Sequence, residues 1–309
     1  MTRPGGGAGS VTGLGSTRIG PREFRWGDRT YVMGIVNATP DSFSGDGLLA
    51  AVGSPRPGAG DPIVIAWAVA QARRMVDEGA DILDVGGEST RPGHEEVSAD
   101  EERRRVVPVI AAIRHALPDI PISVDTTKAS VAAAAMDGGA NLINDIWGVA
   151  DRTELVDLAA ARRAPIILMH NRAAARYTGL MTEVVADLEA AIERALSAGV
   201  PRDAVIVDPG FGFGKTPLHN LALLRDLSGL RVLRRPILLG TSRKSTLGRV
   251  LDLPPEERVE ATLATTALGI ANGADMIRVH DVRPNVRAAR MADAVVRGPS
   301  VALRAELAQ

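Results

Sequence analysis

Acidic and amide side chains stand at the ends of several short apolar runs in this chain. Four of them recur in this setting: Asp84, Asp125, Asn144 and Asp208. A carboxylate can accept two parallel N–H bonds from a guanidine-like edge, and a neighbouring amide can donate and accept at once. Together they suit a heterocycle with an amino-pyrimidinone edge. For a single residue such as Asp125 the alternative is a cap on the following helix. Asp84 is the weakest candidate of the four, and its alternative is to brace the loop behind it.

The last of these residues begins a glycine-rich octet, Asp208-Pro209-Gly210-Phe211-Gly212-Phe213-Gly214-Lys215. Glycine lets a backbone come close to a flat ligand, and a phenylalanine ring can stack on it. The octet therefore predicts one wall of the same pocket.

Cationic residues near the last two apolar runs indicate a second kind of chemistry. The segment Gly240-Thr241-Ser242-Arg243-Lys244-Ser245 opens a helix, while Arg278 and His280 lie at the end of the following run. Helix N-terminal amides and nearby cations hold anions, so these groups, together with Asn37 from the first run, predict a diphosphate site. A structural ion pair is the alternative for Arg278, and an ordinary hydrogen-bonded polar residue is the alternative for His280.

The motifs of zinc and redox-metal sites do not occur in the sequence. HExxH, CxxC and paired-histidine spacings are missing, which disfavours such a metal. A Mg²⁺ ion carried in by a diphosphate needs few protein ligands, and Asn37 could supply one.

Eight apolar runs must position these side chains. They cover about residues 31–36, 82–83, 122–124, 142–143, 166–169, 205–207, 237–239 and 276–279. The stretches between them have helical patterns, and the joins into the following runs carry Gly or Pro. Ser98 is expected to cap one helix, with Glu101 three positions later. Such alternation, with polar residues at each strand exit, is typical of an α/β fold, the (β/α)8 TIM barrel, in a single domain.

The composition fits one folded domain without a strongly charged surface. Hydrophobic residues make up 45% of the 309, and the net charge is −1, which argues against nucleic acid or a membrane surface as a partner. No cysteine occurs, which excludes disulfides and thiolate chemistry, and no apolar run is long enough to cross a bilayer. Residues 1–20, rich in Gly and Ser, predict a flexible, disordered leader on a cytoplasmic protein, with residues 21–309 forming the barrel.

The connection from Asn37 to Asp61 is unusually long and rich in Gly and Pro. As a long first βα loop, it is predicted to be a lid over the site. An insertion without function is the alternative for residues 48–60.

Lysine is rare and clustered. Only three of the 36 basic side chains are lysines, and Lys128, Lys215 and Lys244 all follow shortly after an apolar run. In a chain that otherwise uses arginine, this pattern predicts that a compact ammonium group is needed at these positions.

Seven motifs occur in order from the first apolar run to the last. They are residues 33–44, 79–93, 124–126, 144–148, 208–215, 242–245 and 278–281. Their sequences and order resemble those of the dihydropteroate synthases, a family of pterin-binding enzymes. The resemblance covers about residues 30–297.

The resemblance implies an enzyme of folate biosynthesis that uses Mg²⁺. It would condense (7,8-dihydropterin-6-yl)methyl diphosphate with 4-aminobenzoate, giving 7,8-dihydropteroate and pyrophosphate. It would be a homodimer and a target of sulfonamides. The pterin would be held by Asp125, Asn144, Asp208, Lys244, Met169 and Phe213. The diphosphate and Mg²⁺ would be held by Asn37, Arg278 and His280, which with Lys244 would be the catalytic residues. The 4-aminobenzoate site would be shaped by Phe43, Thr90, Arg91, Pro92 and Ser245.

The chemistry of the residues agrees with this reaction. Loss of pyrophosphate leaves a cation delocalised into the pterin ring, and neutralising the diphosphate is electrostatic work suited to Arg278, His280 and Mg²⁺. Two rival interpretations remain. A pterin-binding methyltransferase barrel would not need the clusters at 90–92 and 242–245. A non-catalytic pterin-binding homologue would fit the unusual order Ser44-Gly45-Asp46-Gly47 in the first loop.

Overall fold

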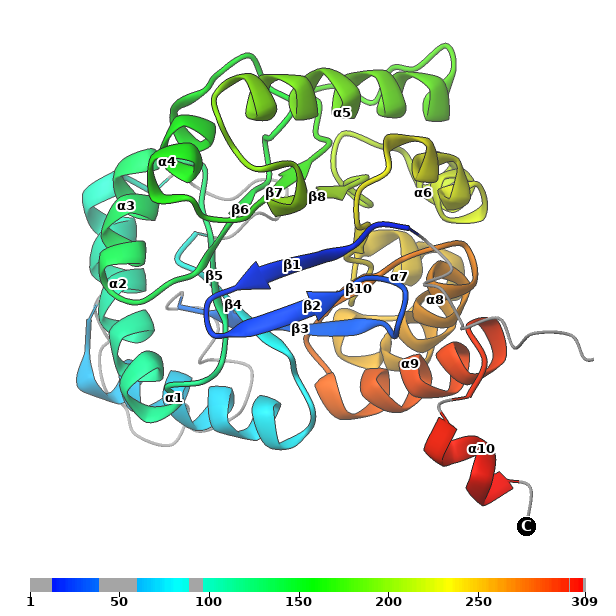
Figure 1. Cartoon of the computed structure of the whole chain (residues 1–309), viewed down its shortest axis with the longest axis horizontal. Coiled ribbons are helices and arrows are strands. Elements are labelled where there is room, and N and C mark those ends of the chain that lie inside the picture. Colours follow the sequence, from blue (N-terminus) through cyan, green and yellow to red (C-terminus); the bar gives the residue numbers. More distant parts are fainter. Residues whose placement is uncertain (1–12, 39–59, 89–96, 300, 308–309) are drawn as a thin grey trace, which may run out of the picture.

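The computed structural model of the chain describes residues 13–38, 60–88, 97–299 and 301–307. Eight parallel strands follow one another around its centre (Figure 1), and they are β3 (Tyr31–Asn37), β4 (Ile82–Gly86), β5 (Ile122–Asp125), β6 (Leu142–Asp145), β7 (Ile166–Met169), β8 (Val205–Asp208), β9 (Leu238–Leu239) and β10 (Met276–Val279). The sheet order is β8-β7-β6-β5-β4-β3-β10-β9, and a parallel bridge between Val207 and Ile237 joins the two ends. The predicted (β/α)8 barrel is therefore confirmed.

Helices form the outer ring of the barrel (Figure 1). They are α1 (Pro62–Asp77), α2 (Ala99–Ala116), α3 (Ala129–Asp137), α4 (Glu154–Arg162), α5 (Leu180–Ser197), α6 (Pro217–Arg225), α7 (Ser245–Leu251), α8 (Val259–Ala271) and α9 (Val282–Val296), with α10 (Val301–Leu307) after them. The predicted cap of α2 is confirmed, because the Ser98 side chain accepts a hydrogen bond from the Glu101 amide. A short 3-10 turn, Pro255–Glu257, precedes α8.

Alternation along the strands directs side chains to two faces of the barrel wall, one toward the interior and one toward the helices. The interior cluster contains Met33, Ile82, Leu142, Ile206 and Met276, whereas the residues between them pack against the helices. Side chains two positions apart in a strand share a face. Continuing two residues toward the strand exits, the same faces therefore carry a polar layer: Asp84, Asn144, Asp208 and Arg278.

A hairpin closes the other end of the barrel. It consists of β1 (Ser16–Ile19) and β2 (Arg22–Arg25), and Figure 1 shows it lying across the ring of strands. Phe24 and Trp26 are fully buried with Ile19 in the interior cluster, and the Tyr31 ring lies 4.7 Å from that of Phe24. The flexible leader expected over residues 1–20 is therefore wrong from β1 onward; residues 1–12 lie outside the described part.

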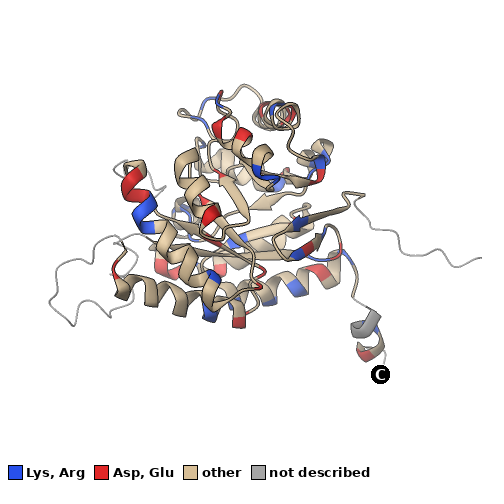
Figure 2. Ribbon diagram, turned by 60° about the vertical axis from the view of Figure 1, so that its left-hand side comes forward, with Lys and Arg blue, Asp and Glu red and all other residues tan. Residues whose placement is uncertain are grey.

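The outer surface carries charges of both signs. Figure 2 shows Lys and Arg side by side with Asp and Glu on the outer helices, in keeping with the net charge of −1. Among the described residues, no helix has the length and apolar character needed to cross a membrane.

Candidate active site

The polar layer lies at the carboxyl ends of neighbouring strands. Strand register sets Asp125 opposite Asn144 across β5 and β6, and Met169 opposite Asp208 across β7 and β8. Asp125 is paired on its other side with Gly86 at the end of β4. The residues predicted to hold the pterin are therefore brought together by the ladder itself.

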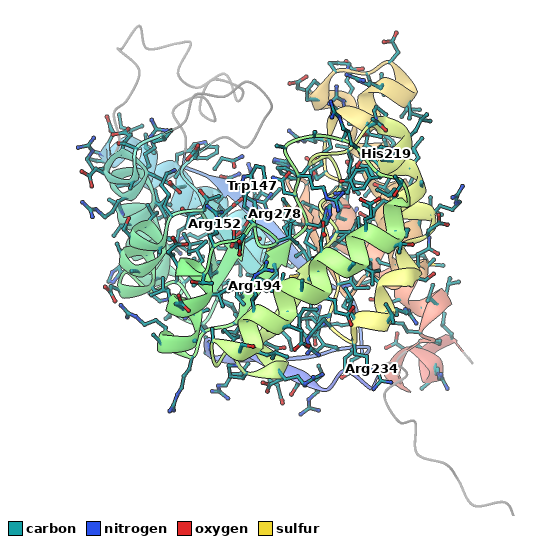
Figure 3. All side chains as sticks on the ribbon, turned by 90° about the horizontal axis from the view of Figure 1, so that it is seen from above. Trp147, Arg152, Arg194, His219, Arg234 and Arg278 are labelled. Atoms are coloured by element: carbon teal, nitrogen blue, oxygen red, sulfur yellow. The ribbon has the colours of Figure 1, made fainter. Side chains whose placement is uncertain are left out.

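Arg278 from β10 reaches across this layer and joins two carboxylates. Its Nε lies 2.5 Å from Oδ2 of Asp84, and its Nη2 lies 2.6 Å from Oδ2 of Asp125. The arginine side chain is 18% exposed, and the two aspartates are 0% and 8% exposed. Nδ2 of Asn144 donates to the same oxygen of Asp84 at 3.2 Å. Figure 3 shows Arg278 inside the barrel, at the opposite end from Arg234 and the hairpin.

The burial of these charges shifts their pKa values. Burial raises the pKa of Asp125 to about 7, although Arg278 opposes the shift. Burial also opposes the charge of Arg278, but Asp84 and Asp125 outweigh it and raise the pKa of the guanidinium. Oδ1 of Asn144 and Oδ1 of Asp84 are buried with no hydrogen-bond partner among the described residues. Because unpartnered buried acceptors are costly, the layer is suited to a ligand that brings N–H donors.

The glycine-rich octet forms the adjoining wall. Oδ1 of Asp208 accepts from the Gly210 amide at 2.7 Å, which leaves the other carboxylate oxygen for a ligand. Gly210 has φ +68°, and a Cβ there would lie 1.8 Å from the His170 carbonyl oxygen, so only glycine fits. Nζ of Lys244 donates to the Phe211 carbonyl and lies 4.4 Å from the centre of the Phe213 ring.

Lys244 and Asp208 influence each other electrostatically. Burial lowers the pKa of Lys244 to about 8, with Asp208 opposing the shift. Burial raises the pKa of Asp208, with Lys244 opposing. Each of the two groups, at the edge of the octet, therefore favours the ionised form of the other.

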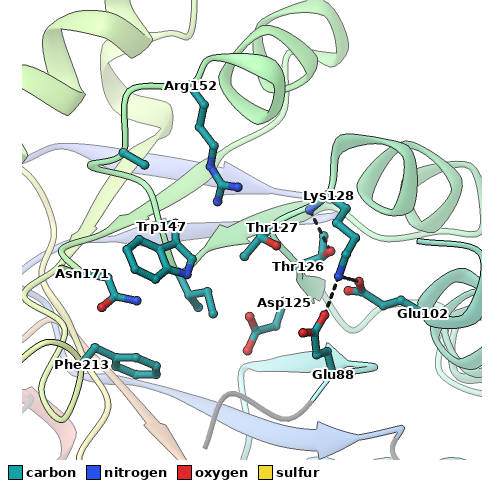
Figure 4. Close-up of a pocket in the computed structure, with 12 residues that line it drawn as sticks. Glu88, Glu102, Asp125, Thr126, Thr127, Lys128, Trp147, Arg152, Asn171 and Phe213 are labelled. Carbon is teal, nitrogen blue, oxygen red and sulfur yellow. Dashed lines mark hydrogen bonds and ion pairs between the residues drawn. The ribbon is translucent and has the colours of Figure 1, made fainter. Parts of the chain in front are cut away.

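A pocket of about 560 Å³ opens beside Asp125. Figure 4 shows Phe213, Asn171 and Trp147 on one side of Asp125 and Lys128 with two glutamates on the other. Nζ of Lys128 lies 2.5 Å from Oε2 of Glu88 and 2.7 Å from Oε2 of Glu102. Flat aromatic walls around a carboxylate suit a planar heterocycle.

The residues predicted to hold anions lie on the neighbouring strands. Nδ1 of His280 lies 3.0 Å from Oγ of Ser242, so the segments after β9 and β10 are linked at the strand exits. Arg243 makes a bidentate ion pair with Asp281, at 2.9 and 2.6 Å, which fixes its direction. Ser245 is exposed at the start of α7, a helix of only seven residues. Asn37 ends β3 and is partly buried.

The structure therefore brings together most of the predicted residues. Asp125, Asn144, Asp208, Lys244, Met169 and Phe213 lie on adjoining strands or their exits. Phe43, Thr90, Arg91 and Pro92, and the predicted lid, lie outside the described residues.

Two features were not foreseen from the sequence. Asp84 was ranked as the weakest of the four candidates, with bracing of a loop as its alternative, whereas it is the buried partner of both Arg278 and Asn144. Trp147 was not singled out, although it follows Asn144 in the same motif and lines the pocket. Its position after a strand exit was the available signal.

Comparison with known proteins gives concordant matches. The family model described as "Pterin binding enzyme" matches residues 33–280. A curated dihydropteroate synthase from Clostridium beijerinckii is 50% identical over 281 residues, covering 91% of this chain and 99% of that protein. The solved dihydropteroate synthase from Clostridium difficile, in the presence of pteroic acid, has a TM-score of 0.82 at 46% identity and covers 89% of this chain and 99% of its own. That of Xanthomonas albilineans, with 4-aminobenzoic acid, has a TM-score of 0.81 at 40% identity and covers 91% and 98%.

Proposed function

Since this chain belongs to the pterin-binding enzyme family, among its dihydropteroate synthases, we propose how its residues carry out the reaction of folate biosynthesis. The enzyme condenses (7,8-dihydropterin-6-yl)methyl diphosphate with 4-aminobenzoate to give 7,8-dihydropteroate and pyrophosphate. The methyltransferase and non-catalytic alternatives considered from the sequence are set aside, because the relatives are named as synthases.

The pterin is proposed to bind in the polar layer of the barrel mouth. Asp125 and Asp208 would each accept N–H bonds from its amino-pyrimidinone edge, and Oδ1 of Asn144 would accept a further one. This buried, unpartnered acceptor among carboxylates is the observation that carries the proposal. Phe213 and Met169 would contact the ring faces, and Lys244 would donate to the ring from above Phe213.

The diphosphate would lie toward the strand exits, next to Arg278, His280 and Asn37. Nε and Nη2 of Arg278 are used by Asp84 and Asp125, so Nη1 is the group proposed to meet a phosphate oxygen. As the C–O bond to the leaving pyrophosphate breaks, charge grows on that oxygen, and the fixed guanidinium stabilises it without moving. Ser242 would orient His280 for the same task through its hydrogen bond to Nδ1.

Magnesium is proposed as the accompanying ion. When bound with the diphosphate it would supply positive charge to the leaving group. Asn37 would hold it through one amide oxygen, and this single protein ligand suits an ion that keeps most of its water and phosphate ligands.

The second substrate would approach from the rim. Its amine is neutral, so attack on the pterin methylene needs no strong base, and the proton is lost to water after the C–N bond has formed. Ser245 is exposed at this rim and is proposed to contact the carboxylate. Phe43, Thr90, Arg91 and Pro92 are proposed, from the family resemblance, to complete this site. A sulfonamide that imitates aminobenzoate would occupy the same place.

A cytoplasmic homodimer is proposed as the working state. The outer faces of α7, α8 and α9 expose large apolar side chains, which support an interface there: Val250, Leu251, Leu268, Met291, Val295 and Val296. Light scattering of the purified protein tests the dimer, and a monomer at micromolar concentration would refute it. Cell fractionation tests the location.

The reaction is tested by pyrophosphate release. The purified enzyme should release it from the pterin diphosphate rapidly only when Mg²⁺ and 4-aminobenzoate are both present, with dihydropteroate formed in equal amount. Asp208→Ala should remove the activity, because a buried pterin edge would lose its paired acceptor. Wild-type protein without turnover, or Asp208→Ala with unchanged turnover, would refute the assignment.

A further inference from the structure

One cluster of titratable residues has no part in the chemistry described so far, although it touches the pterin wall from behind. It consists of His170, Arg172, Asp187 and Lys215, from the exit of β7, the middle of α5 and the end of the octet. His170 is fully buried. Lys215 is one of the three lysines of the chain.

The ammonium group of Lys215 is surrounded by acceptors. Its Nζ lies 3.1 Å from the Gly210 carbonyl oxygen and 3.1 Å from that of Phe213. It lies 2.9 Å from Nδ1 of His170. The His170 carbonyl oxygen is a fourth, more distant acceptor at 3.4 Å. An ammonium has three N–H donors, so the three nearer acceptors are enough to use all of them. The octet thus wraps around the group that ends it.

This arrangement fixes the tautomer of His170. Burial lowers the pKa of Lys215 to about 7. Below that pH the group is charged and has no lone pair to offer, so Nδ1 of His170 must be the acceptor. The proton of the neutral ring therefore lies on Nε2, which faces Oδ2 of Asp187 at 3.1 Å. Arg172 holds the same carboxylate oxygen through Nε at 3.0 Å and Nη2 at 2.8 Å. The hydrogen bonds between the octet and α5 therefore all point the same way: Lys215 donates to His170, and His170 donates to Asp187.

The octet is held at its other backbone groups as well. The Gly212 amide donates to Oδ1 of Asn220 at 2.8 Å, and the Tyr177 hydroxyl donates to the Gly214 carbonyl at 2.9 Å. On the pterin side, Lys244 donates to the Phe211 carbonyl. Lys215 thus binds the carbonyls of Gly210 and Phe213, and Lys244 binds the Phe211 carbonyl that lies between them in the sequence.

We propose that Lys215, oriented by His170 and Asp187, is a positioning residue that sets the octet so that Asp208 and Phe213 meet the pterin. This inference rests on the proposed function of the octet as the pterin wall. It assigns work to a lysine that touches no substrate. Without the ammonium, the Gly210 and Phe213 carbonyls would lose their shared donor, and the turn between Asp208 and Phe213 would have several conformations in place of one.

The first test measures ligand binding and kinetics separately. Lys215→Met should weaken the affinity for a hydroxymethyl pterin without diphosphate by about tenfold, the effect of roughly one lost net hydrogen bond or a little more. The aminobenzoate KM should change by less than about twofold, because that site lies at the rim. Lys215→Arg should not restore the affinity, because a planar fork cannot bring one nitrogen within reach of three acceptors.

Two further variants separate positioning from folding. Asp187→Asn should give a smaller loss of pterin affinity, because the amide can still accept from His170. Glu189→Gln, an exposed carboxylate in the same helix α5, should change nothing. If Lys215→Met lowers the melting temperature and the active fraction but leaves the pterin Kd unchanged, or if Lys215→Arg restores binding, the positioning role is wrong.

The last experiment does not depend on enzymatic activity. Burial lowers the pKa of His170 to about 4 and that of Lys215 to about 7. Between these two values, nitrogen-15 NMR of the wild-type protein should show His170 as the neutral Nε2–H tautomer, with Nδ1 as the unprotonated nitrogen. A proton on Nδ1 would refute the assignment even if Lys215→Met fails to fold. Wild-type protein that lacks pyrophosphate release would instead refute the proposed function and leave this tautomer result standing.

Discussion

Asp84 and Arg278, 194 residues apart in the sequence, form a buried ion pair in which Oδ2 and Nε lie 2.5 Å apart. Each comes from the inward face of its strand, two residues beyond an apolar residue of the barrel interior. The pair holds the guanidinium between the strand exits and the carboxylates that we propose to bind the pterin. It therefore joins the two halves of the proposed chemistry, recognition of the pterin and departure of the diphosphate.

Removal of the buried carboxylate should strongly reduce stability. We expect Asp84→Ala to lower the free energy of unfolding by about 3 kcal/mol, because Nε of the buried Arg278 and Nδ2 of Asn144 lose their shared acceptor and only Asp125 remains to pair with the guanidinium. Asp100→Ala is the matched control, since its pair with Arg103 is on the surface and should contribute about 0–1 kcal/mol. Urea unfolding measures both. Equal losses would mean that burial of the Asp84 pair has no energetic consequence.

Arg278→Ala should affect the two forms of the pterin differently. Loss of Nη1 removes the contact proposed for the phosphate, and the missing charge matters most as pyrophosphate departs. We expect kcat for the diphosphate substrate to fall by about 100-fold or more, and affinity for a pterin without diphosphate to fall much less. Stopped-flow kinetics and calorimetry measure the two quantities. Similar losses for both ligands would reduce Arg278 to a structural partner of Asp84 and Asp125.

The binding of the pterin should depend on pH through Asp125. Burial raises the pKa of this group to about 7; Asp84, Glu102 and Asp145 add to the shift and Arg278 opposes it. The Asp125 carboxyl group is therefore fully ionised only above that pH. As the pH falls through this value, the group becomes protonated and the carboxylate that accepts N–H bonds is lost. We expect affinity for a pterin without diphosphate to fall on acidification through about pH 7. Asp125→Asn should bind more weakly and lack this acid limb; an unchanged limb would assign it to another group.

Lys244→Arg should be poorly tolerated although the charge is kept. Nζ of Lys244 donates to a carbonyl of the octet and lies over the Phe213 ring, and a planar guanidinium is too broad for that place. We expect kcat/KM for the pterin diphosphate to fall by about tenfold or more. Arg249→Lys, the reverse change at an exposed position of the same helix, should have no effect. Near-normal turnover of Lys244→Arg would show that any cation suffices there.

Much of the fold, and the position of the proposed pterin residues at the barrel mouth, could be predicted because both depend on local periodicity. Two-residue alternation places Asn144 above Leu142 and Asp208 above Ile206, so a run of apolar residues that ends in a polar one indicates the barrel mouth. The scarcity of lysine was also informative, since Lys128, Lys215 and Lys244 each meet several acceptors or a ring in the structure.

The partnerships across the barrel could not be predicted in this way. The direction of the Arg278 side chain depends on carboxylates from two distant strands, and Asp84 was misjudged for that reason. The hairpin was missed because Ser16–Ile19 is a four-residue strand next to a glycine-rich segment. Its burial depends on Phe24 and Trp26, whose partner Tyr31 belongs to the first barrel strand.

The hairpin at the bottom of the barrel closes the interior at that end. Because Phe24 and Trp26 fill that end, ligands reach the polar layer only through the mouth and leave by the same route. A molecule seated on Asp125 and Asn144 must therefore enter before anything that rests above it, and it cannot depart until that second molecule has gone or has been joined to it. The closed end of the barrel thus sets the order in which substrates bind and products leave during turnover.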